Sequence, residues 1–122
     1  MVIEVPGRDL WFANGHTLRL LFAKAQEVSY LNEGDRQALE AALYVKHLDL
    51  ERLDEDRAVR LARAVEDAAS ELRSELREIG DELEDGLDPY HESLCAALAP
   101  LEESLHKWLL SVQKRSPSDA DR

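Results

Sequence analysis

The sequence predicts a mainly α protein: a helical bundle with a long antiparallel helical hairpin and a short N-terminal β-hairpin. Two long runs of apolar residues recur mostly at alternating steps of three and four positions, which is typical of helices with one packed face. A short turn separates the runs, and short connections join antiparallel neighbours. The 122 residues suit one domain, which we expect over residues 1–113, followed by a flexible polar tail at 114–122.

The β-hairpin is expected over residues 1–13. Residues 2–5 and 10–12 are β-prone, and Pro6-Gly7 between them suits the centre of a type II turn. A two-stranded hairpin is marginal in water by itself, so we expect it to pack on the helices. Asn14 can then cap the first helix.

Two short helices are expected next. The first covers about residues 16–30, and the second follows Asn32 and Asp35, which form a variant of the capping-box pattern, and ends near His47. We expect residues 48–53 to be a connector with apolar anchors. The predicted core positions of the two helices are Leu18, Leu21, Phe22, Ala25, Val28, Ala38, Leu39, Ala42, Leu43 and Val45.

The first long helix is expected over residues 54–84. Asp54 is a good N-cap, and the apolar register continues across Gly80, which favours one uninterrupted helix with a weak point at that glycine. Arginines near its start are expected to pair within the helix, Arg60 with Asp56 and Arg63 with Asp67. Its predicted seam contains Ala58, Ala62, Val65, Ala69, Leu72, Leu76, Ile79 and Leu83.

The second long helix is expected over residues 89–113. Pro89 suits the first helical position, whereas Pro100 inside the pattern should kink the helix or start a new one. The predicted seam contains Tyr90, Leu94, Leu98, Leu101, Leu105, Trp108 and Val112. Leu72, Leu76, Leu101 and Leu105 should therefore be buried between the two long helices.

The charge of the chain restricts the partners that it can bind. The formal net charge is −11, from 26 Asp and Glu against 15 Lys and Arg. Such a chain repels nucleic-acid phosphates and anionic membranes, but its charge would speed the encounter with a basic protein. No apolar run approaches the ~20 residues of a bilayer span, no secretory signal is visible, and one cysteine forms no internal disulfide. We therefore expect a cytoplasmic protein.

Acidic residues concentrate where the first long helix ends. Carboxylates in the last turn oppose the helix macrodipole by about 0.3–1 kcal/mol each, and Glu78 with Glu82 is a repulsive i, i+4 pair. Residues that are unfavourable for the local helix electrostatics are candidates for a functional site. However, runs of charged residues are also common on helix faces that contact only solvent. The predicted partner-binding residues are Glu75, Glu78, Asp81, Glu82, Glu84, Asp85 and Asp88.

Motifs for catalysis, cofactors and metals give little support to those functions. Neither glycine-rich phosphate loop nor a nucleophile elbow occurs, so we predict no enzyme, no cofactor and no catalytic residue. Glu103 and His106 form a single E-x-x-H, whereas di-metal bundles need two. His91 and Cys95 provide only two zinc ligands, and tetrahedral zinc takes at least three. We therefore predict no metal site.

The sequence thus favours a non-catalytic, acidic protein-interaction domain that binds a basic protein partner, such as an inhibitor of the immunity-protein type or a regulator. Two alternatives stay open. One is a helical metal- or small-ligand-binding protein that uses Glu103, His106, His91 and Cys95. The other is a homodimer formed through the long helices.

Overall fold

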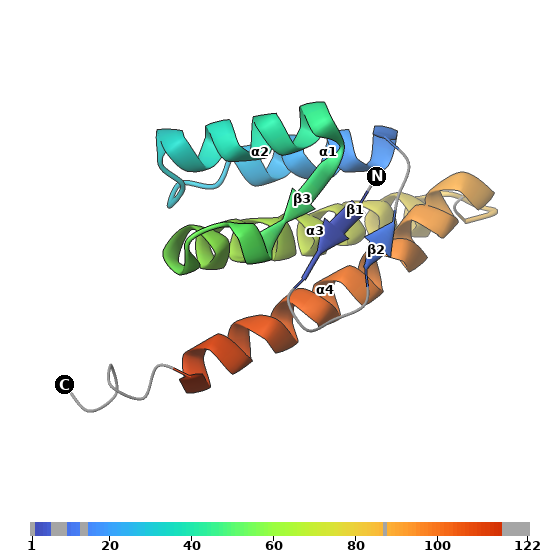
Figure 1. Cartoon of the computed structure of the whole chain (residues 1–122). Helices are drawn as coiled ribbons and strands as arrows, with labels where there is room; N and C mark the ends of the chain where they lie inside the picture. The colour runs from blue at the N-terminus through green and yellow to red at the C-terminus, as the bar shows by residue number, and fades with distance from the viewer. Residues whose placement is uncertain (1, 6–9, 13–14, 87, 116–122) are drawn as a thin grey trace.

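The structure, a computed structural model, describes residues 2–5, 10–12, 15–86 and 88–115. Its elements follow in the order β1 (Val2–Glu4), β2 (Trp11–Phe12), α1 (Gly15–Gln26), α2 (Glu33–Val45), β3 (His47–Asp49), the 3₁₀ helix η1 (Leu50–Arg52), α3 (Glu55–Glu82) and α4 (Pro89–Arg115). The predicted fold class is confirmed: the chain is mainly α, with two long packed helices and a small sheet at the N-terminus (Figure 1).

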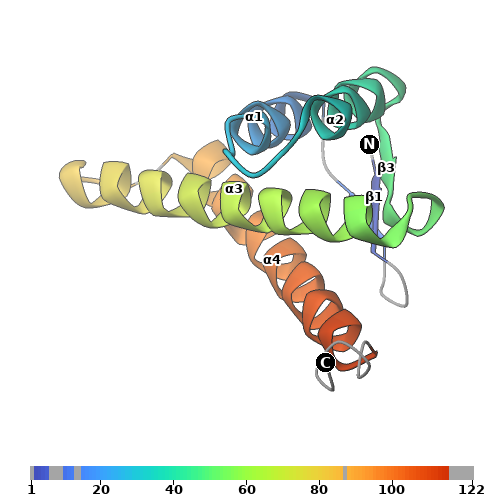
Figure 2. The ribbon, with the colours of Figure 1, turned by 90° about the vertical axis from the view of Figure 1, so that its left-hand side faces the viewer.

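Helix α3 forms the centre of the molecule. Helices α1 and α2 lie on one side of it and α4 on the other, and α4 crosses α3 and diverges from it toward the C-terminus (Figure 2). Leu72, Leu76, Leu101 and Leu105 are all buried, as the sequence predicted. Most of the α3 seam is therefore used within one chain.

The sheet has three strands in the order β2-β1-β3. The predicted hairpin is present, with β1 antiparallel to β2 and Ile3 opposite Trp11, but its turn and Asn14 lie outside the described residues. The third strand was missed, because residues 48–53 were expected to be a connector. Instead β3 pairs in parallel with β1 and places Leu48 opposite Ile3, both buried.

Hydrogen bonds at the helix ends explain where the short helices begin and end. Asn32 and Asp35 form a complete capping box at the start of α2, as predicted. Helix α1 ends at Gln26 rather than near residue 30, because the guanidinium of Arg36 donates to the carbonyl oxygens of Gln26 and Val28. These contacts satisfy terminal carbonyls that a longer helix would have bonded internally.

The ends of the long helices follow the sequence closely. Asp54 caps α3, which continues through Gly80 to Glu82, and the N–H of Leu83 donates to the carbonyl of Gly80. Helix α4 runs through Pro100 as one helix, so the alternative of a new helix starting there is wrong. Helix α4 also extends to Arg115, and the rest of the predicted tail lies outside the described residues.

A buried carboxylate connects the start of α2 to α3. Asp35 has no exposed surface and accepts hydrogen bonds from Arg57 Nε (3.0 Å) and from Arg60 Nε (2.7 Å) and Nη2 (3.0 Å). These bonds and that from the Asn32 backbone N–H lower the pKa of Asp35 to about 2. The expected pairing of Arg60 with Asp56 is wrong, because Arg60 donates to Asp35 instead.

The side chain of Trp11 fixes the sheet to the helices. Its indole Nε1 donates to the carbonyl oxygen of Ala97 in α4 at 2.8 Å, and the ring is buried.

None of the described helices combines the length and the apolar character that a bilayer crossing requires.

Candidate functional site

The predicted acidic residues lie at the tip of the hairpin, where α3 ends and α4 begins. We call residues 75–86 and 88–90 the hairpin tip. Figure 2 shows the end of α3 projecting beyond α1 and α2, so the tip extends from the body of the molecule. Gly86 has a φ of +74°, a left-handed conformation that glycine adopts without steric cost and that reverses the chain between the helices.

Two of the seven predicted residues have structural partners. Glu75 accepts a 2.7 Å hydrogen bond from Lys24 of α1, and this bond raises the pKa of Lys24. Asp88 accepts from the backbone N–H of His91 at 3.0 Å and contacts the His91 ring at 2.6 Å, and these bonds lower the pKa of Asp88. Glu75 thus attaches α3 to α1, and Asp88 caps the first turn of α4.

The other five residues have no such partners. Each is exposed, and none forms an ion pair or a side-chain hydrogen bond with another residue in the described part of the chain. They leave five negative charges at one end of the molecule, where the C-terminal end of the α3 macrodipole adds negative potential. The five are Glu78, Asp81, Glu82, Glu84 and Asp85.

Large apolar side chains accompany these acids. Ile79, Leu83 and Tyr90 are exposed by 48%, 50% and 44%. The sequence placed all three in the buried seams, and this expectation is wrong. Its cause is the position of the partner helix: the first buried residue of α4 is Leu94, so the last turn of α3 and the first turn of α4 extend past the packed core. The apolar period alone does not show where a partner helix ends.

The residues of the proposed helical metal site do not meet. His106 contacts Glu66, His91 contacts Asp88, and Cys95 interacts with Arg73. Glu103 lies on an exposed face of α4, where Lys107 pairs with it. A metal-binding grouping of three or more side chains occurs elsewhere in the described residues, at Glu4, His47 and Asp49.

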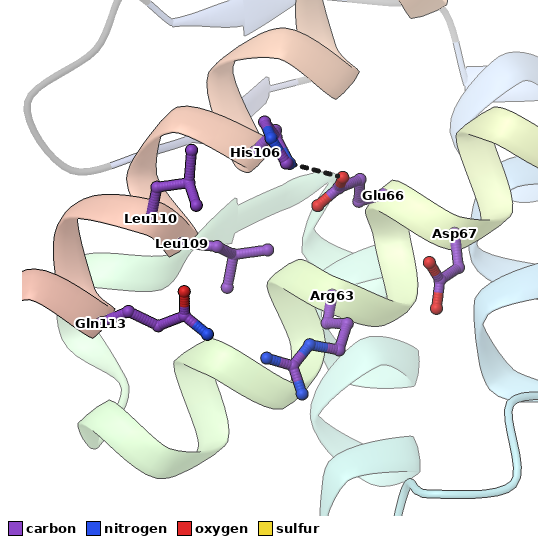
Figure 3. Close-up of a pocket in the computed structure, with 7 residues that line it drawn as sticks. All are labelled: Arg63, Glu66, Asp67, His106, Leu109, Leu110 and Gln113. Atoms are coloured by element: carbon purple, nitrogen blue, oxygen red, sulfur yellow. Dashed lines mark hydrogen bonds and ion pairs between the residues drawn. The ribbon is translucent and has the colours of Figure 1, made fainter. Parts of the chain in front are cut away.

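A cleft opens where α3 and α4 diverge, with a volume of about 260 Å³ (Figure 3). Arg63 and Gln113 reach into it from opposite helices, and Glu66 contacts His106 across it at 3.2 Å. Asp67 accepts a hydrogen bond from the Tyr30 hydroxyl at 2.8 Å. Burial, together with this bond, raises the pKa of Tyr30. One arginine and two carboxylates give the lining a net negative charge, so the cleft does not favour an anionic ligand.

A second groove, of about 420 Å³, lies between α2 and the segment β3–η1. Its lining is largely apolar, with His47, Asp49 and Arg52 as the polar contributors. The groove is not predicted from the sequence, because it is formed by β3, where the sequence predicts a connector. The alternation of His47, Leu48, Asp49 and Leu50 is a period-2 signal that could have identified the strand.

The chain was compared with protein-family models, with curated proteins and with solved structures, and none of the three comparisons finds a significant match.

Proposed function

We propose that this protein is a non-catalytic interaction domain whose hairpin tip binds a positively charged surface of a partner protein. The observation that carries the proposal is the composition of the tip: it contains both five exposed acidic residues without partners among the described residues and three exposed apolar side chains. A central apolar contact inside a polar rim is the usual arrangement of a protein interface. The acids would steer the encounter and the apolar side chains would slow dissociation.

The negative charge of the tip favours binding to a basic protein over binding to a second copy of this chain. Two tips brought together would each carry five unpaired carboxylates against the single cation Arg77, and like-charge contacts of this kind cost several kcal/mol in total. A homodimer through the long seam has little surface left, because the seam residues of α3 from Ala58 to Leu76 are already buried within one chain. A basic surface would instead neutralise the repulsion between Glu78 and Glu82.

An inhibitor of the immunity-protein type, or a regulator of comparable size, fits these properties. A protein that acts by covering a basic site on its target needs no reaction chemistry of its own. A cytoplasmic location and the absence of enzymatic activity remain predictions from the sequence. The helical ligand-binding alternative now depends on the α3–α4 cleft, which contains His106 but none of the other three residues proposed for it.

Site-specific photo-crosslinking in the native host tests the proposal. A benzophenone amino acid replaces Leu83 at the tip, and in the control it replaces Tyr44, which is 87% exposed at the end of α2. We expect a basic protein to be cross-linked from position 83 and not from position 44. Equal cross-linking from both positions, or an acidic product from position 83, would contradict the proposal.

Charge neutralisation provides a second test on the same complex. The tip variant carries Glu78→Gln, Asp81→Asn, Glu82→Gln and Asp85→Asn. We expect its cross-linking yield from position 83 to fall sharply while its helical circular dichroism is unchanged. Its free energy of unfolding should rise slightly, because the like-charge pair and the unfavourable dipole contacts are removed.

The matched control removes the same number of charges elsewhere. It carries Glu27→Gln, Glu40→Gln, Glu51→Gln and Glu55→Gln, four exposed residues outside the tip. We expect this control variant to cross-link like the wild-type chain. A comparable loss in both variants would mean that overall charge, and not the tip, determines binding.

A further inference from the structure

The parallel pairing of β1 with β3 brings three potential metal ligands together. Glu4 lies opposite Asp49 in the register, and His47 precedes Asp49 by two positions on the same strand. Successive side chains of a strand alternate between the two faces, so all three project from one face of the sheet. Ile3 and Leu48 alternate with them along the strands and are buried.

The ligand atoms are close enough to share one ion. The imidazole Nε2 of His47 lies 2.5 Å from Oε2 of Glu4, and one donor atom from each of the three side chains lies within 4.8 Å of the other two. On a tetrahedral zinc ion with bonds of about 2.1 Å, neighbouring donor atoms are about 3.4 Å apart. Binding would therefore separate His47 from Glu4 by about 1 Å, a change that the half-exposed side chains allow.

The donor set identifies the class of metal. Carboxylates alone suit calcium or magnesium, whereas an imidazole shifts the preference toward zinc and its transition-metal neighbours. Three protein ligands leave one tetrahedral position for water or a bound ligand. From this geometry we infer that Glu4, His47 and Asp49 form a zinc-type divalent metal site with an open coordination position, a function separate from that of the hairpin tip.

The surroundings of Asp49 favour a fixed ligand. Its Oδ1 accepts a 3.0 Å hydrogen bond from the backbone N–H of Glu51. In metal proteins, hydrogen bonds of this kind, from groups that do not bind the metal, hold a ligand in its orientation. The competing cation is Arg52, whose Nε lies 3.3 Å from Oδ2 of Asp49. The Arg52 side chain is 87% exposed, so it can turn into solvent when a metal binds.

The groove beside the site indicates what kind of ligand could occupy the open coordination position of the metal. His47 and Asp49 line the groove of about 420 Å³, together with Val45, Leu53 and small side chains of α2. A small ligand with one metal-binding atom and an apolar body would match this combination. The site departs from the sequence-based expectation of no metal, which considered only motifs on the helices.

Zinc titration of the untagged chain, stripped of metal with a chelator, tests the inference. Binding is followed by isothermal titration calorimetry, and thermal unfolding is measured with and without zinc. We expect one zinc ion per chain and a zinc-dependent rise in melting temperature, because a ligand that binds the folded state stabilises it. His47→Gln and Glu4→Gln should each weaken binding by at least about tenfold and remove the rise in melting temperature.

The chain supplies its own control. His91 and Asp88 form a similar pair, at 2.6 Å, and no third metal-ligating side chain joins them in the described part of the chain. His91→Gln should therefore leave zinc affinity and stoichiometry unchanged. Circular dichroism establishes that each variant is folded, and Glu4→Gln provides a test even if His47→Gln disturbs β3. No saturable binding to the wild-type chain, or an equal loss in His91→Gln, would overturn the inference.

Discussion

The buried carboxylate of Asp35 should make the stability of this protein depend on pH in the acid range. Replacing it with asparagine keeps the size of the side chain and removes the charge that Arg57 and Arg60 contact. In the folded state the pKa of Asp35 is lowered to about 2 from an ordinary value of 3.8. This difference corresponds to about 2 kcal/mol of stability, at 1.36 kcal/mol for each pH unit.

The sign of the effect follows from the direction of the pKa shift. Because the folded pKa lies below the unfolded one, the contribution is complete above about pH 4 and disappears as the pH falls through about 2. Removing one partner of a buried ion pair costs about 3–5 kcal/mol when the other charge stays buried. Here the arginine side chains are 34% exposed and can be partly rehydrated, so about 2–3 kcal/mol is the expected loss at pH 7.

Urea unfolding followed by circular dichroism measures this loss at pH values from 7 down to 2. The difference in unfolding free energy between the wild-type chain and Asp35→Asn should be constant from pH 7 to about 4 and then shrink. Asp81→Asn, an exposed acid without a partner in the described residues, is the control and should show no such dependence. A difference below half a kcal/mol at pH 7, or one that stays constant down to pH 2, would refute the proposed pairing.

Three further predictions concern the core and its attachments. Leu76 is buried in α3, so Leu76→Ala should lower the free energy of unfolding, measured by urea titration, by about 2–5 kcal/mol. A loss under about half a kcal/mol would mean that the seam is not packed. Trp11→Phe removes the 2.8 Å bond to the Ala97 carbonyl and should cost about 1 kcal/mol or more, with faster amide hydrogen exchange in β1 as the second readout. Gly34→Ala places a methyl group 2.5 Å from Nη2 of Arg57, the free end of a flexible side chain that can move aside, and alanine is the better helix former. The free energy of unfolding should therefore change by less than about 1 kcal/mol, and a loss of more than about 2 kcal/mol would mean that Arg57 is held rigidly in place.

Much of the helical architecture could be predicted from the sequence because it depends on local signals. The capping box at Asn32, the N-cap at Asp54 and the turn before Pro89 each act within a few residues of their own position. The heptad seam of α3 could be recognised for the same reason. Local periodicity also correctly indicated that α3 continues through Gly80.

The features that were missed depend on contacts between distant segments. Strand β3 is short and needs β1, some 45 positions away in the sequence, to form its hydrogen bonds. The pairing of Arg57 and Arg60 with Asp35 crosses from α2 to α3 and replaces part of the local pairing that helix spacing favoured. The exposure of Ile79 and Leu83 depends on where the packed part of α4 begins, which no pattern within α3 reveals.

The acidic residues of the tip could be selected from the sequence, because acids at a helix C-terminus oppose the helix dipole and this effect depends only on neighbouring positions. Their lack of partners and the apolar side chains among them required the structure. Five of the seven remain as candidate binding residues, whereas Glu75 and Asp88 have structural contacts that explain their position. We therefore expect substitutions at these two to affect stability more than binding.

Once cross-linking has identified the partner, its rate of association with this chain, measured against ionic strength, shows whether the acids of the tip steer binding. At low salt the wild-type chain and the variant neutralised at Glu27, Glu40, Glu51 and Glu55 should associate rapidly, and both should slow as salt screens the charges. The variant neutralised at the tip should associate more slowly at low salt and depend less on ionic strength, because its steering charges are gone. An unchanged association rate for the tip variant at low salt would mean that the acids of the tip do not steer binding.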